Sequence, residues 1–142
     1  MKVLVINGVN LNMLGIREPG VYGTQTLDSI NEYIKEHCDK IGVEVDFFQS
    51  NIEGELVNMI HKAHFEYDGV VLNAGAFTHY SYALHDAIAS ISKPVIEVHI
   101  SNISARDEFR SKSVISEVCK GCIFGLGKMG YTLAIDYLAN AK

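Results

Sequence analysis

Short apolar runs recur four times along the chain, and each is followed directly by an amide or imidazole side chain. The runs end at Asn7, Gln49, Asn73 and His99. They are rich in valine and isoleucine and are separated by helix-length stretches, which is typical of strands buried on both faces of a parallel sheet. Such sheets bind ligands just beyond the carboxyl ends of their strands. The four polar ends therefore predict a binding or active site at one edge of the sheet.

Strands and helices alternate in the predicted layout. We expect strands at residues 2–7, 43–48, 69–72, 94–99 and 121–124, and helices at 26–41, 53–65, 81–91 and 128–141. Thr26 is suited to cap the first helix and Gly42 to end it. The stretch 8–23 has no helical period and predicts a long loop of the kind that usually carries function. The alternation predicts an α/β fold, namely a flavodoxin-like, doubly wound, five-stranded parallel sheet in a three-layer α/β/α sandwich.

Length and composition favour one domain without a nucleic-acid or membrane partner. The chain has 142 residues, 48% of them apolar, which is enough for one well-filled core, so we expect a single domain over residues 1–142. A net charge of −5 and only three arginines argue against binding a phosphate backbone. No run approaches the roughly 20 apolar residues of a membrane span, and Met1 leads into a strand instead of a signal peptide. We therefore expect a cytoplasmic protein, and three cysteines, an odd count, suit a reducing compartment.

Two short motifs resemble cofactor or redox sites but lack the necessary context. Residues 125–130 spell G-x-G-x-x-G between a strand and a helix, but only 12 residues follow. A dinucleotide fold needs a further strand and an acidic residue about 20 positions on, so we interpret these glycines as a tight turn and close helix packing. Cys119 and Cys122 form a C-x-x-C that leads into a strand, whereas a redox pair opens a helix. We expect structural thiols there, and no cofactor is predicted.

The fourth strand carries the first candidate for proton transfer. Glu97 and His99 are two residues apart, so their side chains point to the same side of the pleat. A carboxylate in that position can accept the imidazole N–H, set its tautomer and favour its protonated form. The pair is either a proton donor or a buried, hydrogen-bonded pair without chemistry, and its place at the end of a central strand favours the donor.

The first loop carries a candidate base. Arg17 and Tyr22 are five residues apart around Pro19 and Gly20, so one turn can bring both side chains over a pocket. An unperturbed tyrosine has a pKa of about 10 and is not a base at neutral pH, so it needs close cations in a water-poor site. Arg17 is the nearest candidate along the chain. A loop tyrosine and arginine taken alone are more often solvated or packed.

Further polar residues follow the other predicted strands. Asn10 lies in the first loop, where asparagine often only satisfies turn backbone. Asn73 and His79 flank a glycine-containing turn after the third strand, and Ser101 follows His99 where free backbone N–H groups could hold a carboxylate. Arg110 suits ligand oxygens or is simply a surface charge.

Five ungapped segments together resemble one enzyme family, type II 3-dehydroquinate dehydratase. They are NGVNLNMLGIREPGVYG (7–23), NAGAFTHYS (73–81), IEVHISN (96–102), RDEFRSKS (106–113) and GCIFGLGKMGY (121–131), in family order over nearly the whole chain. Two residues depart from the family pattern, since the family usually has proline where this chain has Val9 and Ala74. Both replace a rigid φ with a looser one and remove no reacting group.

The resemblance implies a reaction and residue roles. The family dehydrates 3-dehydroquinate to 3-dehydroshikimate by anti elimination through an enolate, without metal or covalent intermediate. By carry-over, Tyr22 as phenolate removes the C2 proton and Arg17 holds that phenolate. His99, oriented by Glu97, protonates the departing C1 hydroxyl. Asn10 places a water against the enolate oxygen.

The same resemblance implies how the substrate is held. Asn73 and the backbone of Ile100 and Ser101 would bind its carboxylate, and His79 and Arg110 its ring hydroxyls. Asp86, which on sequence grounds could equally be a plain surface carboxylate, would reach the site of a neighbouring subunit. That implies trimers, and the family assembles four trimers into a dodecamer.

Two other function classes remain open from the residues alone. One is a non-enzymatic flavodoxin-like module that binds a small anion or flavin at the same strand ends, although it gives no reason for Tyr22, Arg17 and the Glu97–His99 pair to converge. The other is a metal hydrolase with His79, Glu97 and His99 as zinc ligands.

Overall fold

The computed structural model describes residues 1–16 and 25–141, and a parallel sheet forms its middle layer. Its strands are β1 (Lys2–Asn7), β2 (Glu44–Gln49), β3 (Gly69–Asn73), β4 (Val95–His99) and β5 (Gly121–Phe124). They lie in the order β2-β1-β3-β4-β5, and every neighbouring pair is parallel. This is the flavodoxin-like order of a doubly wound sheet. The predicted fold class is confirmed.

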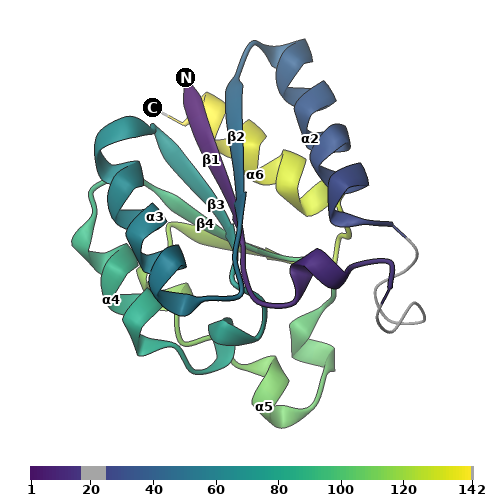
Figure 1. Ribbon diagram of the computed structural model, residues 1–142, viewed down its shortest axis with the longest axis vertical. Helices are drawn as coiled ribbons and strands as arrows, with labels where there is room; N and C mark the ends of the chain where they lie inside the picture. Colours follow the sequence, from purple (N-terminus) through teal and green to yellow (C-terminus); the bar gives the residue numbers. More distant parts are fainter. Residues whose placement is uncertain (17–24, 142) are drawn as a thin grey trace.

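Helices cover both faces of the sheet (Figure 1). The long ones are α2 (Leu27–Ile41), α3 (Glu53–Glu66), α4 (Tyr82–Ser90) and α6 (Met129–Asn140), and a short helix, α5 (Glu108–Ser111), lies near the carboxyl ends of the strands. Helices α2 and α6 pack on one face, and α3 and α4 on the other. Among the described residues, no helix is long and apolar enough to cross a bilayer.

Each inner strand contributes side chains to two cores, which explains its unbroken apolar run. On β1, Val3 and Val5 face α2 and α6, whereas Leu4 and Ile6 face α3 and α4. The alternation also sets the direction of the polar residues at the strand ends, since the side-chain period of a strand is two. Asn7 continues the series on the α2 and α6 side.

The local signals for helix ends are confirmed. Thr26 caps α2, because its Oγ1 accepts a hydrogen bond from the N–H of Ser29 at 3.1 Å. Gly42 ends the helix with a φ of 72°, a left-handed conformation that glycine adopts without strain. Strand and helix bounds otherwise differ from the predicted ones by one or two residues.

The connecting segments contain more structure than the sequence predicts. Within residues 1–16 and 25–141 four 3-10 turns are present: η1 (Leu11–Met13), η2 (Gly75–His79), η3 (Ile103–Ala105) and η4 (Ser116–Val118). The crossover between β4 and β5, where the sequence predicts no element, holds η3, α5 and η4. Such short turns close i→i+3 hydrogen bonds and bury few side chains, so they leave no hydrophobic period in the sequence.

The loops after β1 and β3 pack backbone against backbone, at the positions where the chain departs from the family's prolines. A Cβ on Gly8 would lie 2.3 Å from the carbonyl oxygen of Ala74, and one on Gly75 would lie 2.6 Å from that of Val9. Only glycine permits this approach. Gly8 also donates its N–H to the carbonyl of Asn73 at 2.7 Å. The two loops therefore form one joined wall at the carboxyl edge of the sheet.

The glycine motif before α6 is structural, as predicted. Gly125 turns the chain with a φ of 83°. A Cβ on Gly130 would lie 3.2 Å from the Val98 side chain and 3.4 Å from that of Ile123, so this glycine lets α6 pack closely on β4 and β5.

Candidate active site

A cavity of about 120 Å³ lies at the carboxyl ends of β1, β3 and β4. This is the edge of the sheet at which the sequence predicts a site. Seven of the predicted site residues line the cavity: Asn10, Asn73, His79, His99, Ile100, Ser101 and Arg110. The structure thus brings together residues from four separate segments of the chain.

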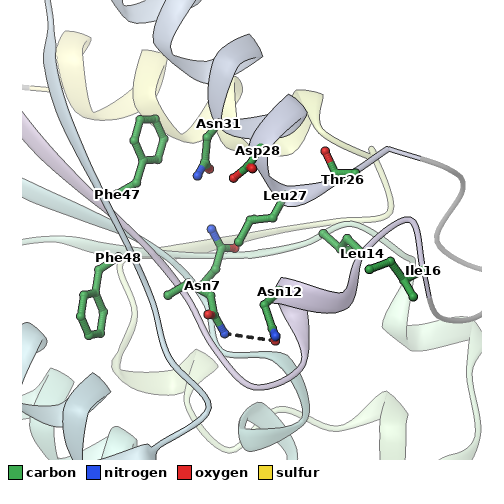
Figure 2. A pocket seen from close by; sticks show the side chains of 11 residues that line it. Asn7, Asn12, Leu14, Ile16, Thr26, Leu27, Asp28, Asn31, Phe47 and Phe48 are labelled. Atoms are coloured by element: carbon green, nitrogen blue, oxygen red, sulfur yellow. Dashed lines mark hydrogen bonds between the residues drawn. The ribbon is translucent and has the colours of Figure 1, made fainter.

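A larger cavity, about 470 Å³, lies beside it between β2 and the start of α2 (Figure 2). Figure 2 shows Asn7, Asn31 and Asp28 around its opening, with Asn12 on η1 below them. Its described lining contains no imidazole and no guanidinium. We therefore assign proton-transfer chemistry to the smaller cavity, where two histidines and two arginines meet.

Glu97 and His99 form a buried pair on the α4 side of β4. His99 donates its Nε2–H to Oε2 of Glu97 at 2.6 Å, which confirms that the two side chains share one side of the pleat. Glu97 is 0% exposed and His99 5%. Burial alone would raise the pKa of Glu97, but hydrogen bonds from His99, Ser116 and Ser113 outweigh it and hold that pKa below its ordinary value. The ionised carboxylate can therefore stabilise a protonated imidazole.

The orientation of His99 determines which nitrogen can act on a ligand. Because Nε2 is bound to Glu97, Nδ1 is the nitrogen left for a group in the cavity, and within residues 1–16 and 25–141 no hydrogen bond engages it. The ring also meets the edge of Phe124, with centroids 5.2 Å apart. An imidazolium held in this way is a proton donor through Nδ1.

His79 is oriented by a backbone carbonyl from the crossover. Its Nδ1 lies 2.6 Å from the carbonyl oxygen of Lys112, and a carbonyl only accepts, so Nδ1 carries the proton. In the neutral ring Nε2 is then an acceptor. This tautomer suits a ligand hydroxyl that donates.

A tyrosine that the sequence analysis did not single out holds the two strand-end asparagines. Tyr131 of α6 donates its hydroxyl to Oδ1 of Asn7 at 2.6 Å and accepts from Nδ2 of Asn73 at 2.9 Å. Oδ1 of Asn73 accepts from the N–H of Gly75 at 3.2 Å. Burial raises the pKa of Tyr131 well above its ordinary value, so the hydroxyl stays protonated. The network fixes the amide of Asn73 at the cavity wall.

The cavity wall after β4 is rich in groups that bind anions. The N–H groups of Ile100 and Ser101 donate no hydrogen bond to another described residue, and both residues line the cavity. Arg106 and Arg110 line it as well, so two of the three arginines of an acidic chain lie here. The sequence analysis did not place Arg106 in the site. These groups suit a carboxylate ligand.

Asn10 has an unusual backbone conformation. It is the one non-glycine residue with positive φ among those described, at 66°. Its N–H is held by Oδ1 of Asn51 at 2.8 Å, whereas its own side chain caps no turn. Asn10 lines the cavity, and its two alternatives, a turn residue and a ligand contact, both stay predictions. Strained backbone of this kind clusters at functional sites.

Two predicted site residues among those described, Glu97 and Asp86, do not line this cavity. Glu97 reaches the site through its hydrogen bond to His99. Asp86 lies on the exposed surface of α4, with its side chain 82% exposed and 2.9 Å from Nδ1 of His85. Arg17 and Tyr22 lie outside the described residues, so their predicted roles stay predictions.

The zinc set that we considered is not assembled. Within residues 1–16 and 25–141, no group of three histidine, cysteine or acidic side chains is placed to hold a metal ion. His79 and Glu97 are both occupied by other partners. The three cysteines are free thiols, and burial raises the pKa of Cys119 and Cys122, which is opposite to the shift of a redox-active cysteine.

Comparison with known proteins agrees with this geometry. Residues 1–139 match the family described as dehydroquinase class II. A 3-dehydroquinate dehydratase of Bacillus licheniformis is 56% identical over 140 residues, covering 99% of this chain and 97% of the relative. One from Clostridium perfringens is 52% identical over 141 residues, covering 99% and 98%. The crystal structure of a type II dehydroquinase from Butyrivibrio crossotus superposes with a TM-score of 0.97 at 51% identity, covering 99% and 98% of the two chains. This chain therefore belongs to the class II dehydroquinase family.

Proposed function

We propose that this chain is a hydro-lyase that dehydrates 3-dehydroquinate to 3-dehydroshikimate, in the shikimate pathway that leads to chorismate and the aromatic amino acids. Family membership supports the reaction. The observation in the structure that carries it is the buried Glu97–His99 pair in a cavity lined by arginines and free N–H groups. Elimination of water from a carboxylate-bearing ring needs both a proton donor and an anion site.

Binding of the substrate carboxylate is assigned to the wall after β4. The N–H groups of Ile100 and Ser101 and the fixed amide of Asn73 would hold it, within the positive field of the arginines. His79 and Arg110 would hold the ring hydroxyls, with Nε2 of His79 accepting from one of them. These contacts would hold the ring beside His99.

The chemistry then proceeds in two steps. Tyr22, as a phenolate stabilised by Arg17, takes the C2 proton, and the electron pair of that bond moves into the enolate of the adjacent carbonyl. A water placed by Asn10 stabilises the enolate oxygen. The enolate then collapses and the C1–O bond breaks. Nδ1–H of the His99 imidazolium, which Glu97 stabilises, protonates the leaving oxygen. The products are water and a conjugated enone.

A single assay separates this proposal from its two rivals. We expect the purified protein to convert 3-dehydroquinate to a product with the absorbance of a conjugated enone, and to do so equally well after treatment with EDTA, because no step uses a metal ion. A binding module would form no product. A zinc hydrolase would lose its activity to the chelator.

We also propose a cytoplasmic dodecamer built of trimers, in which Asp86 contributes to a neighbouring site. Asp86 is exposed on α4 and does not line the cavity of its own chain, which suits a role across an interface. Three free cysteines suit a reducing compartment. Light scattering tests the assembly, since a dodecamer has twelve times the chain mass of 15.7 kDa.

A further inference from the structure

A five-residue turn, residues 112–116, runs from the end of α5 to the first residue of η4 and contacts both histidine systems of the site. Its first residue, Lys112, offers the carbonyl that orients His79 at 2.6 Å. Its middle residue, Val114, donates its N–H to the carbonyl of Thr78 at 2.9 Å. Its two serines bind Glu97. We call residues 112–116 the serine turn.

The two serines supply most of the hydrogen bonds to one oxygen of Glu97. Oε1 accepts from the hydroxyl of Ser113 at 3.0 Å, from the hydroxyl of Ser116, and at 3.6 Å from the thiol of Cys122 on β5. Oε2 is bound to His99. A carboxylate that is 0% exposed keeps its charge only if hydrogen bonds replace water, so these donors bear directly on the state of Glu97.

Ser113 has its proton directed by the turn itself. Its Oγ accepts from the N–H of Ile115 at 3.3 Å and from that of Ser116 at 3.1 Å, so its lone pairs are occupied and its hydroxyl hydrogen goes to Glu97. Ile115 is 0% exposed and anchors the turn in the core against α3 and α4. The serines are therefore held by packing and not only by their own hydrogen bonds.

We propose that Ser113 and Ser116 are positioning residues that hold Glu97 ionised with Oε2 directed at Nε2 of His99, and so present Nδ1 of His99 to the leaving hydroxyl. The proposal rests on the proposed function, which identifies His99 as the acid. With Oε1 bound to both hydroxyls, the carboxylate cannot rotate away from the imidazole or take up its proton. The acid step, and not the removal of the C2 proton, depends on the turn.

Few other titratable groups face this carboxylate. They are His99 on its own strand, Cys122 on β5 and Cys119 just before β5. Burial raises the pKa of both thiols, so they stay neutral near pH 7 and add no competing charge. A change in the pH dependence after a serine substitution therefore reports the Glu97–His99 pair.

The test is Ser116→Ala, with Ser116→Thr as the conservative variant that keeps the hydroxyl. A hydrogen bond to a charged group changes an equilibrium by about ten- to a hundred-fold, so proton uptake by Glu97 should move up by about one to two pH units. We expect kcat to fall most at acidic pH, by about tenfold, and progressively less toward neutral and higher pH, with KM within about twofold. Exchange of the C2 proton in D2O should remain, and Ser116→Thr should recover most of the rate.

Ser90→Ala is the matched control, because among the described residues the hydroxyl of Ser90 bonds to the carbonyl of Ala87 in its own helix, at 2.6 Å, and to no other group. It should change neither the rate nor its pH dependence. A Ser116→Ala enzyme with wild-type kcat at every pH would overturn the proposal. So would an equal loss at all pH values, or an equal loss of exchange and elimination.

A second measurement does not depend on activity. The pKa of Glu97 is lower in the folded state than in the unfolded state. Ionised Glu97 therefore stabilises the fold at pH values above its unfolded-state pKa, and this stabilisation is lost as the pH falls through its folded-state pKa. In Ser116→Ala the folded-state pKa of Glu97 moves up toward the unfolded-state value, so less stability depends on this carboxylate. The thermal unfolding midpoint should therefore be lower near neutral pH and should decline less on acidification than in the wild type. Identical midpoint profiles would overturn the role of the turn, whereas absence of enone product from the wild type would overturn only the proposed reaction.

Discussion

Replacing His99 with alanine is expected to lower kcat by about 10²- to 10⁴-fold, the usual contribution of a positioned general acid or base. Among the described residues of the site, His99 is the imidazole whose Nε2 is bound to a buried, ionised carboxylate. It is therefore the group best suited to give up a proton and take one up again. KM should change little, because the proposed contacts to the substrate carboxylate come from Asn73 and the backbone of Ile100 and Ser101, not from the imidazole. The rate of enone formation at saturating substrate measures the effect.

The variant also separates the two steps. Without the acid, the enolate still forms, so exchange of the C2 proton with D2O should continue while the hydroxyl leaves slowly. His61→Ala removes an exposed imidazole from α3 and should leave both rates unchanged. If C2 proton exchange and elimination were both abolished in His99→Ala, the assignment of the acid and the base to two separate groups would be wrong.

Tyr22→Phe is expected to have an even larger effect, a loss of several orders of magnitude in turnover with the fold retained. The substitution removes one hydroxyl and leaves the ring, and the base step precedes every later one. Both C2 proton exchange and elimination should therefore disappear, unlike in His99→Ala. Rapid-quench measurement of deuterium incorporation, together with circular dichroism of the folded variant, distinguishes the two patterns.

Tyr137→Phe provides the matched control, because it removes the same hydroxyl from a half-exposed tyrosine on α6, away from the cavity. It should retain wild-type turnover. Near-native activity from Tyr22→Phe would refute the assignment of the base and require another group to take the C2 proton.

The order of strands and helices along the chain was predictable, because the pattern of buried residues that marks each of them lies within a short stretch of sequence. Runs such as residues 2–7 and 94–99 are apolar on both faces, and helices such as 26–41 repeat apolar residues at a period of 3.6 with recognisable ends at Thr26 and Gly42. The short turns inside 101–116 were missed, since a single turn closes its hydrogen bonds without a periodic apolar face.

Candidate site residues were predictable where they directly follow a strand. Asn73, His99 and Ser101 all lie at the carboxyl edge of the sheet, and the topology alone brings such positions together. Tyr131 and Arg106 gave no comparable signal. Tyr131 reaches the strand ends from α6, and Arg106 enters the cavity from the crossover, so only the packing of distant segments shows either of them near the site.

By itself, the sequence determined the strand and helix content, the parallel sheet, the edge where ligands bind and the pairing of Glu97 with His99, because each follows from spacing within a few residues. Only the tertiary structure decided that Ser113 and Ser116 hold Glu97, that Lys112 orients His79, and which cavity carries the imidazoles. These contacts join residues 16 to 33 positions apart in the chain, and such pairs exist only once the crossover has packed against the sheet.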